Sequence, residues 1–372
     1  MVDLRAQFAA IEKEVRAALD EVLASQQFVL GPQLAAFERE MAQYCGLGAA
    51  VGVASGTDAL LLGLRACGVG PGDEVVVPAF TFVATAGAVS ALGARPVFAD
   101  IEAETLNISP QSVAPRITNR TRAIVAVHFG GVAADLDPLL NLAARLGLPV
   151  IEDNAQSLGA TYNGRKLGTF GTLAATSFYP SKNLGAYGDA GMILTGSEEL
   201  AARLKSLRNH GLTAPGVSSE PAWNSRLDEM QAAVLRVKLR HLDGWIRKRR
   251  ELAALYDAAL AAVPDIRTPR VPRGCEHSYY LYTVRIPSTG KDPSERRNRV
   301  ARHLAERAIA SAVFYPVPLH LQPLYASLGG RLGQLPVAER AASEVLSLPL
   351  YPEMTVAQVE RVSAAVVGAL VS

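Results

Sequence analysis

Cysteine is scarce in this chain of 372 residues, and so are net charge and long apolar runs. The three cysteines, Cys45, Cys67 and Cys275, share no metal-ligand spacing and leave one unpaired in any disulfide scheme, so we expect reduced thiols in a cytoplasmic protein. A net charge of +2 creates no field that would attract nucleic acid or a membrane surface. No apolar run could span a bilayer, and we expect no signal peptide, because the first residues lead into an amphipathic helix.

The length of the chain predicts about two domains. From about residue 50 to 200, apolar strands alternate with helices, a pattern typical of a mainly parallel sheet covered on both faces. After Pro264 the pattern changes to a smaller α+β unit, which includes an expected strand at Ala312–Tyr315. We therefore predict an α/β fold with a large domain at residues 1–245, including N-terminal helices, and a small C-terminal domain at residues 246–372.

A long helix is expected from Met230 to about Leu260, where it would link the two domains. Its polar face is strongly basic, but no aromatic residues are interleaved with the charges. We therefore expect a solvated face with i,i+4 pairing rather than a nucleic-acid stripe. The basic residues of this face are Arg236, Lys238, Arg240, Arg247, Lys248, Arg249 and Arg250.

Lysine is the rarer cation of this chain, with seven lysines against thirty arginines. One of them, Lys182, lies between an apolar strand predicted at Leu173–Tyr179 and a turn that contains Gly185, Gly188 and Gly191. An amine can lose its proton and form a Schiff base, which a guanidinium cannot do. Taken alone, the position fits a structural loop lysine equally well.

Other useful side chains follow predicted strand ends, where ligands bind in open α/β sheets. Asp153 ends an apolar strand, and its carboxylate would need a cation such as a protonated pyridine nitrogen or an arginine. The segment Ser55-Gly56-Thr57 opens a helix that could hold a phosphate together with Ser177, although Ser55 or Thr57 could simply cap that helix. Phe82 could stack on a flat ring. With Lys182, this set matches the needs of pyridoxal 5'-phosphate, which has an aldehyde, a basic ring nitrogen and a phosphate.

Six motifs, spread over nearly the whole chain, resemble those of the DegT/DnrJ/EryC1/StrS family of nucleotide-sugar aminotransferases. They are Ser55-Gly56-Thr57-Asp58-Ala59-Leu60, Pro78-Ala79-Phe80-Thr81-Phe82, Glu152-Asp153-Asn154-Ala155-Gln156, the stretch from Ser177 to Gly191, Asn224-Ser225-Arg226-Leu227-Asp228-Glu229 and Tyr315-Pro316-Val317-Pro318-Leu319-His320. The resemblance implies the fold-type I architecture, which is like that of aspartate aminotransferase. It also implies a homodimer with pyridoxal 5'-phosphate at the subunit interface.

The resemblance implies roles for individual residues as well. Lys182 resembles the Schiff-base lysine, and Asp153 resembles the partner of the pyridine nitrogen. The other expected cofactor ligands are Gly56, Thr57 and Ser177 at the phosphate, Phe82 on the ring face, Gln156 near the phenolic oxygen and Asn224 from the other subunit. The expected substrate-side residues are Tyr187, Arg226, Tyr315 and His320. His320 could equally be a packed loop residue.

The residues around Lys182 also divide the family. Here Tyr179-Pro180-Ser181-Lys182-Asn183-Leu184-Gly185 precedes Gly188-Asp189-Ala190-Gly191, which resembles members that aminate C-3 of a sugar. We therefore expect transfer of an amino group from L-glutamate to a keto group at C-3 of a dTDP- or UDP-linked sugar. Phe314 departs from the histidine that many C-3 members carry. The alternatives are amination at C-4, a sugar dehydratase, in which histidine replaces the lysine, and a non-catalytic regulator that binds a nucleotide sugar.

Overall fold

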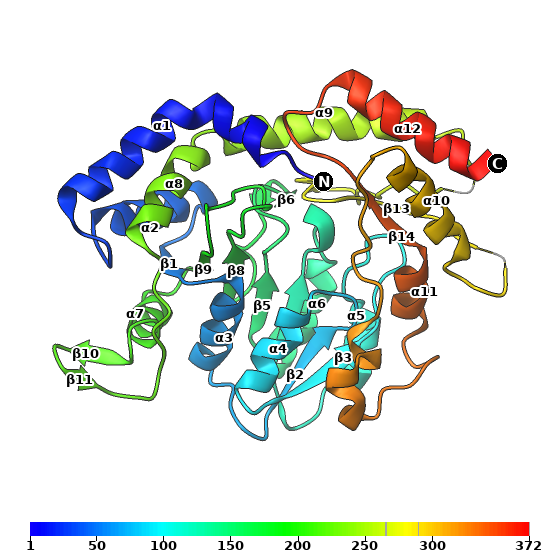
Figure 1. Cartoon of the computed structure of the whole chain (residues 1–372). Coiled ribbons are helices and arrows are strands. Elements are labelled where there is room, and N and C mark those ends of the chain that lie inside the picture. The colour runs from blue at the N-terminus through cyan, green and yellow to red at the C-terminus, as the bar shows by residue number, and fades with distance from the viewer. Residues whose placement is uncertain (265, 289, 372) are drawn as a thin grey trace.

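The computed structural model describes residues 1–264, 266–288 and 290–371, and a seven-stranded sheet lies at its centre (Figure 1). The strand order is β1-β9-β8-β5-β4-β2-β3, and every strand except β9 runs in the same direction. The strands are β1 (Ala49–Val53), β2 (Glu74–Pro78), β3 (Arg95–Ala99), β4 (Thr121–Val127), β5 (Val150–Asp153), β8 (Leu173–Ser177) and β9 (Gly191–Thr195). The prediction of a mainly parallel sheet is confirmed.

Helices cover both faces of this sheet, because its strands carry apolar side chains on both sides. On β2, Val75 and Val77 pack toward one face, while Val76 packs toward the other. The helices on the first face are α3 (Gly56–Ala66), α4 (Val83–Ala91) and α7 (Glu198–Leu207). Those on the second face are α2 (Pro32–Cys45), α5 (Pro110–Val113), α6 (Leu136–Leu146) and α8 (Glu229–Leu239).

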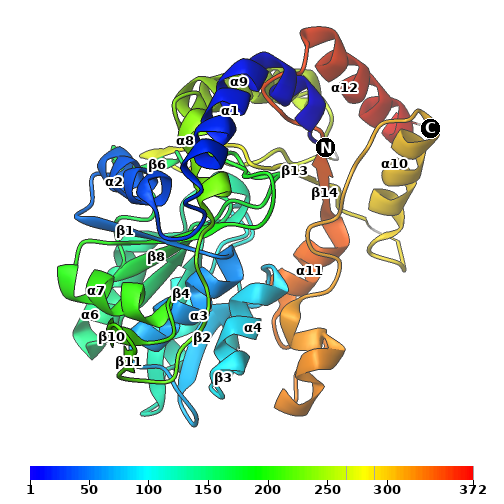
Figure 2. The same ribbon diagram turned by 60° about the vertical axis from the view of Figure 1, so that its left-hand side comes forward.

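A second hydrophobic core lies in the C-terminal part of the chain. It is built by α9 (Leu242–Leu260), β13 (Tyr282–Arg285), α10 (Glu295–Glu306), β14 (Val345–Leu348) and α12 (Val356–Val371). Helices α9 and α12 lie side by side, and the N-terminus lies beside this second core (Figures 1 and 2). A separate core fits the expected small α+β domain, while the boundary at residues 245 and 246 remains a prediction.

Shorter elements and the N-terminal helix complete the fold. Helix α1 (Leu4–Ser25) packs against α8. The remaining elements are β6 (Thr161–Tyr162), β7 (Arg165–Lys166), β10 (Leu212–Ala214), β11 (Val217–Ser218), β12 (Cys275–Glu276), α11 (Pro336–Glu344) and the 3-10 helices η1 (Ala114–Arg116), η2 (Phe129–Gly131), η3 (Leu319–Leu321) and η4 (Pro323–Leu328). Within the described residues, no helix combines the length and the apolar character that a bilayer crossing requires.

The single helix expected from Met230 to about Leu260 is wrong. Helix α8 ends at Leu239, and α9 begins at Leu242. At the break the N–H of His241 donates to the Lys238 carbonyl, a tighter i→i−3 turn. The side chains of Arg240 and His241 both reach Glu14 of α1, which ties this corner to the N-terminal helix.

The strand expected at Ala312–Tyr315 is also wrong. The segment forms one isolated bridge, in which Ala312 and Ser347 exchange two backbone hydrogen bonds. Pairing ends there because Tyr315 turns away to meet Gln156, and because the following Pro316 has no N–H to donate.

Two of the basic residues expected on a solvated face are in fact buried. Lys238 is 0% exposed, and Arg249 is 3% exposed. Both donate to backbone carbonyls instead of lying in water. The expectation fails for them because α8 and α9 are covered by other segments on the side that carries these residues. The three free cysteines differ in burial: Cys45 is buried, and Cys67 and Cys275 are half-buried.

Candidate active site

The carboxyl ends of β1, β8 and β5 and the start of β9, which lies between β1 and β8, bring the main site residues together. Ser177 at the end of β8 pairs with Gly191 of β9, which in turn pairs with Val53 at the end of β1. On the other side of β8, Asp153 at the end of β5 pairs with Ala175. From the spacings of strands and residues in a sheet, the Cα atoms of Asp153 and Ser177 are about 8 Å apart. One small aromatic ring with a phosphate arm can bridge such a span.

Beside Ser177, the N-terminus of α3 forms a cradle of backbone N–H groups. Ser55 caps the helix by accepting a hydrogen bond from the N–H of Asp58 at 3.1 Å, so the capping interpretation of this serine is confirmed. The first N–H groups of a helix have no acceptor within it, which leaves Gly56 and Thr57 able to bind an anion. A Cβ on Gly56 would lie 2.5 Å from the Ser177 Cβ, so only glycine allows this close approach.

Two adjacent carboxylates at the end of β5 have opposite environments, because neighbouring strand residues point to opposite faces. Glu152 is fully buried, and its oxygens accept hydrogen bonds from the Gly168, Phe170 and Gly171 N–H groups and contact His128 Nε2 at 2.9 Å. Burial favours a raised pKa for Glu152, but His128 and the backbone donors outweigh it and the pKa is lowered. Glu152 is therefore a satisfied structural carboxylate.

Asp153 has fewer donors and a charge that is incompletely compensated. It is 5% exposed, and it accepts hydrogen bonds from the Thr85 hydroxyl at 2.8 Å and the Ala155 N–H at 3.2 Å. Burial raises the pKa of Asp153, although Thr85, Ala155 and the Lys182 charge oppose the rise. A buried carboxylate of this kind is stabilised by a further cation, and a protonated pyridine nitrogen fits that need.

Lys182 lies in the loop between β8 and β9, within electrostatic reach of Asp153. Its Nζ is 4.2 Å from the centre of the Tyr280 ring. Tyr280 also interacts electrostatically with Tyr315, whose hydroxyl accepts a hydrogen bond from Gln156 at 3.0 Å. Burial raises the pKa of Tyr315, with Tyr280 and Asp153 adding to the rise. These contacts place the amine, the carboxylate and two phenols around one space.

Phe82 borders the same group of residues. Its ring centre is 6.2 Å from that of Tyr315, and the side chain is 54% exposed. A large aromatic side chain left open to solvent beside Tyr315 is free to cover a bound ring. The described chain thus brings together Gly56, Phe82, Asp153, Gln156, Ser177, Lys182 and Tyr315. Thr57 is exposed on the first turn of α3.

Four other expected residues have contacts elsewhere. Asn224 is exposed, and its backbone forms an isolated β-bridge with Asn209. Arg226 donates a hydrogen bond to the side-chain oxygen of Asn209. Tyr187 is 37% exposed and packs its ring against Phe8 of α1.

His320, the fourth of these residues, is buried in η3. It is 3% exposed, and its Nε2 lies 3.0 Å from Glu339. This environment favours the packed-loop interpretation that the sequence left open.

Sequence reasoning missed two residues that shape the site. Thr85 lies three residues after Phe82 on α4, and nothing in its local pattern marks it as the partner of a distant aspartate. Tyr280 comes from a segment beyond α9, about a hundred residues after Lys182. The contact between Tyr280 and Lys182 could not be predicted, because only the folded chain brings these two segments together.

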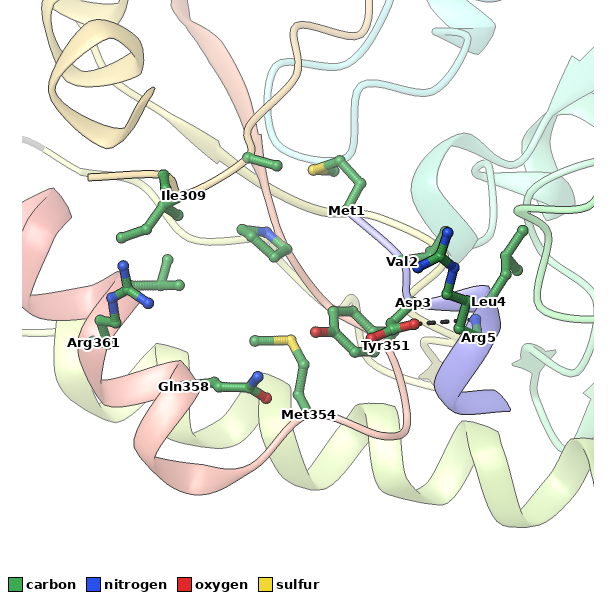
Figure 3. Close-up of a pocket in the computed structure, with 14 residues that line it drawn as sticks. Met1, Val2, Asp3, Leu4, Arg5, Ile309, Tyr351, Met354, Gln358 and Arg361 are labelled. Carbon is green, nitrogen blue, oxygen red and sulfur yellow. Dashed lines mark hydrogen bonds between the residues drawn. The ribbon is translucent and has the colours of Figure 1, made fainter. Parts of the chain in front are cut away.

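A pocket of about 520 Å³ lies apart from this cluster (Figure 3). It is lined by residues 1–5 and 308–310, by Pro349, Tyr351 and Met354, and by residues of α12, and Figure 3 shows Asp3, Tyr351 and Met354 facing into it. None of the residues gathered around Lys182 lines this pocket. This pocket is therefore separate from the candidate active site around Lys182.

Comparison with known proteins identifies the family. A model of the DegT/DnrJ/EryC1/StrS aminotransferase family matches residues 9–367, so this chain belongs to that family of aminotransferases. The family and the fold class expected from the sequence are both confirmed.

Individual relatives match over almost their full length. A Streptomyces venezuelae protein named dTDP-3-amino-3,4,6-trideoxy-alpha-D-glucose transaminase is 46% identical over 98% of this chain and 94% of its own. A Geobacillus stearothermophilus protein named pleiotropic regulatory protein is 47% identical over 95% of this chain and 94% of its own. The crystal structure of S. venezuelae DesV in complex with a ketimine intermediate has a TM-score of 0.93 and 46% identity, covering 98% of this chain and 96% of that one.

Proposed function

We propose that this protein uses pyridoxal 5'-phosphate to move the amino group of L-glutamate to the C-3 keto group of a dTDP- or UDP-linked sugar. The observation that carries the proposal is the buried carboxylate of Asp153 within electrostatic reach of the Lys182 amine. Both ligands of the cofactor ring are then present in one chain, with the Gly56 and Ser177 cradle at the neighbouring strand end. The relative named as a 3-amino sugar transaminase supports C-3 as the position.

When bound, pyridoxal 5'-phosphate supplies an aldehyde that condenses with amines and a ring that accepts electrons from the adjacent carbon. Asp153 keeps the ring nitrogen protonated, which its burial and its few donors favour. The Gly56 and Thr57 N–H groups and the Ser177 hydroxyl would hold the phosphate. Phe82 would cover one face of the ring, and Gln156 would lie near its phenolic oxygen.

Lys182 holds the cofactor between turnovers and then moves protons. Its free amine would take the proton from Cα of glutamate and deliver it to the cofactor carbon on the other side of the amino nitrogen, so that one base would serve both positions. Water would then release 2-oxoglutarate, and the amino group would stay in the site. The same residues then act in the reverse order on the sugar ketone, with Tyr315 and the residues Tyr187 and Arg226 on the substrate side.

A homodimer completes this site in the proposal. Asn224, Arg226 and Tyr187 are exposed or half-buried and lie outside the Lys182 cluster of their own chain, so they are available to a partner subunit. Exposed apolar side chains at Phe28, Val29 and Leu30 offer surface for that contact. We place the assembly in the cytoplasm, with the domain boundary at residues 245 and 246 as expected from the sequence.

A regulator that binds a nucleotide sugar without turnover is the second candidate function, since one relative is named as a regulatory protein. The presence of Lys182 favours an aminotransferase over a dehydratase. A panel of dTDP-, UDP- and GDP-linked 3-keto and 4-keto sugars, with glutamate as donor, separates the remaining alternatives. Formation of 2-oxoglutarate and of an amino sugar of the expected mass supports the enzyme, and binding without either product supports the regulator.

Replacing the lysine tests the assignment of Lys182. Lys182→Ala should abolish turnover while leaving the urea midpoint of the cofactor-free protein unchanged, because Lys182 is half-buried and lies in a loop. Lys248→Ala is the matched control, since Lys248 is a surface lysine paired with Glu251 on α9. Borohydride reduction followed by peptide mapping should locate the cofactor on residue 182. Steady-state transamination by Lys182→Ala would reject the assignment.

A further inference from the structure

The lysine on α8, Lys238, is buried in a way that its sequence context does not explain. It is 0% exposed, and its Nζ donates a 2.7 Å hydrogen bond to the carbonyl of Gly185. The same Nζ lies 4.2 Å from the centre of the Tyr187 ring. Burying an ammonium group is unfavourable unless it is well partnered. Both of its partners belong to the loop that carries Lys182.

This loop is held by α8 at more than one point. The N–H of Tyr187 donates to the side chain of Gln231 at 2.8 Å, and the Gln231 amide donates back to the Tyr187 carbonyl at 3.4 Å. Gly185 packs directly on the backbone of Pro180, so a side chain at this position would collide with the loop itself. The turn that follows Lys182 is therefore closed on itself and fastened to α8 by Lys238 and Gln231.

A second buried cation holds the other wall of the space around Lys182. Arg249 on α9 donates to the carbonyls of Tyr279 at 3.1 Å and Leu350 at 2.7 Å. The next residue after Tyr279 is Tyr280, whose ring lies against the Lys182 amine. Two buried cations on consecutive helices thus fix the two segments between which the amine lies.

The charge of one carboxylate acts on both cations. Burial lowers the pKa of Lys238 to about 8 and that of Arg249 to about 10, and in each case the charge of Glu353 opposes the change. Glu353 lies between Tyr351 and Met354, two residues that face the pocket of Figure 3. The C-terminal part of the chain thereby contributes a negative charge that acts on α8, which holds the Lys182 loop, and on α9, which holds the segment of Tyr280.

We propose that Lys238 is a positioning residue of this enzyme, which fixes the turn after Lys182 so that the amine stays directed at the cofactor site and the Tyr187 ring stays in place. The inference rests on the proposed role of Lys182. It assigns a function to a residue whose contacts are with the loop that carries Lys182. A residue that merely filled the core would stabilise the fold without any specific effect on residues 183–190.

The test compares Lys238→Met with two other variants of the full-length protein. Methionine has a similar length without the charge or the donor, Lys238→Arg restores both, and Lys248→Met is the matched surface control. Backbone hydrogen exchange of residues 178–190 and the affinity for pyridoxal 5'-phosphate are measured together with the urea midpoint. Loss of a hydrogen bond from a charged donor should speed exchange of the Ala186 and Tyr187 amides and weaken cofactor binding by about 10-fold.

The local pattern of these changes decides the outcome. Faster exchange confined to residues 183–190, weaker cofactor binding, an unchanged midpoint and recovery in Lys238→Arg support the proposal. Unchanged exchange and unchanged affinity, or exchange that rises uniformly along the chain with a lower midpoint, overturn it.

If Lys238→Met is insoluble, Glu353→Gln keeps every atom of α8 and should speed exchange of the same residues by roughly 3-fold, given the strength of partly buried charge interactions. No change in exchange in that variant overturns the proposal.

Borohydride labelling of residue 182 in the unmodified protein is run beside these variants. If residue 182 is not labelled, the proposed function fails whatever the variants do. If it is labelled and Lys238→Met behaves like Lys248→Met, the proposed function stands and the positioning role fails.

Discussion

Replacing Asp153 by asparagine should have opposite effects on the cofactor-free and the cofactor-bound protein. The substitution keeps the size of the side chain and removes its charge. Its hydrogen bonds can be kept, because the Thr85 and Thr81 hydroxyls lie 3.1 Å apart and either can be the donor. Thr85 can therefore donate to Thr81 and accept from the new amide, while the amide oxygen still accepts from the Ala155 N–H.

The effect on the cofactor-free protein follows from the raised pKa of Asp153. Burial raises this pKa above its ordinary value of 3.8, so the protonated form stabilises the fold fully below pH 3.8. That contribution is lost as the pH rises through the pKa of the folded protein, above which the carboxylate is buried as an anion. Asp153→Asn should therefore be at least as stable as the parent at pH 7, and its advantage should disappear as the pH falls below 3.8.

The cofactor-bound protein should instead lose stability. Removing one partner of a buried ion pair costs about 3 kcal/mol, which corresponds to a roughly 150-fold weaker affinity for the cofactor. At a cofactor concentration 1,000 times the dissociation constant, binding stabilises the parent by about 4 kcal/mol. After a roughly 150-fold loss of affinity, the same concentration should stabilise the variant by only about 1 kcal/mol.

Urea unfolding with and without pyridoxal 5'-phosphate, repeated at several pH values, measures both effects. Thr85→Ser is the control, since it retains the hydroxyl that contacts Asp153. The reasoning would be refuted by a variant that is less stable without the cofactor yet gains as much from it as the parent does. Such a result would mean that Asp153 serves the fold and has no cation to receive.

Two further substitutions test the frame of the site. Gly56→Ala places a Cβ 2.5 Å from the Ser177 Cβ, and the resulting overpacking should lower the unfolding free energy by about 1–3 kcal/mol, as measured by urea unfolding. It should also weaken phosphate binding, as measured by cofactor titration. An unchanged affinity would show that the cradle is not the phosphate site. Glu229→Ala removes the acceptor of the Gly31, Gln33 and Leu34 N–H groups at the start of α2, and it should lower the unfolding free energy by about 3 kcal/mol. The control, Glu251→Ala on the surface, should change the unfolding free energy by less than about 0.5 kcal/mol. Equal effects in these two variants would contradict the role of the buried acceptor.

The parts of the site that the sequence predicted are those fixed by local pattern and by the logic of parallel sheets. Asp153 and Ser177 each end an apolar strand, and because such ends share one edge their proximity followed without any coordinates. Gly56 was predicted in the same way, from the transition of a strand to a helix.

Contacts that depend on distant segments were not predictable. Thr85 meets Asp153 across 68 positions of sequence, and Lys238 meets Gly185 across 53. On helical periodicity alone, Lys238 and Arg249 belong to a basic face, because the segments that cover them come from elsewhere in the chain. The break between α8 and α9 had the same origin, since it is fastened by Glu14 of the N-terminal helix.

The reversed direction of β9 has a dynamic consequence. Because β8 and β9 are antiparallel neighbours, the chain leaves the sheet after Ser177 and returns to it at Gly191 beside the same residue. Hydrogen bonds from the Phe178 N–H to the Ala190 carbonyl and from the Ala186 N–H to the Phe178 carbonyl close the excursion at its base. The amine of Lys182 can therefore change position by rotation about side-chain bonds, which takes picoseconds to nanoseconds, while the closed base of the loop stays in place. Proton transfer by this amine then requires no opening of the loop.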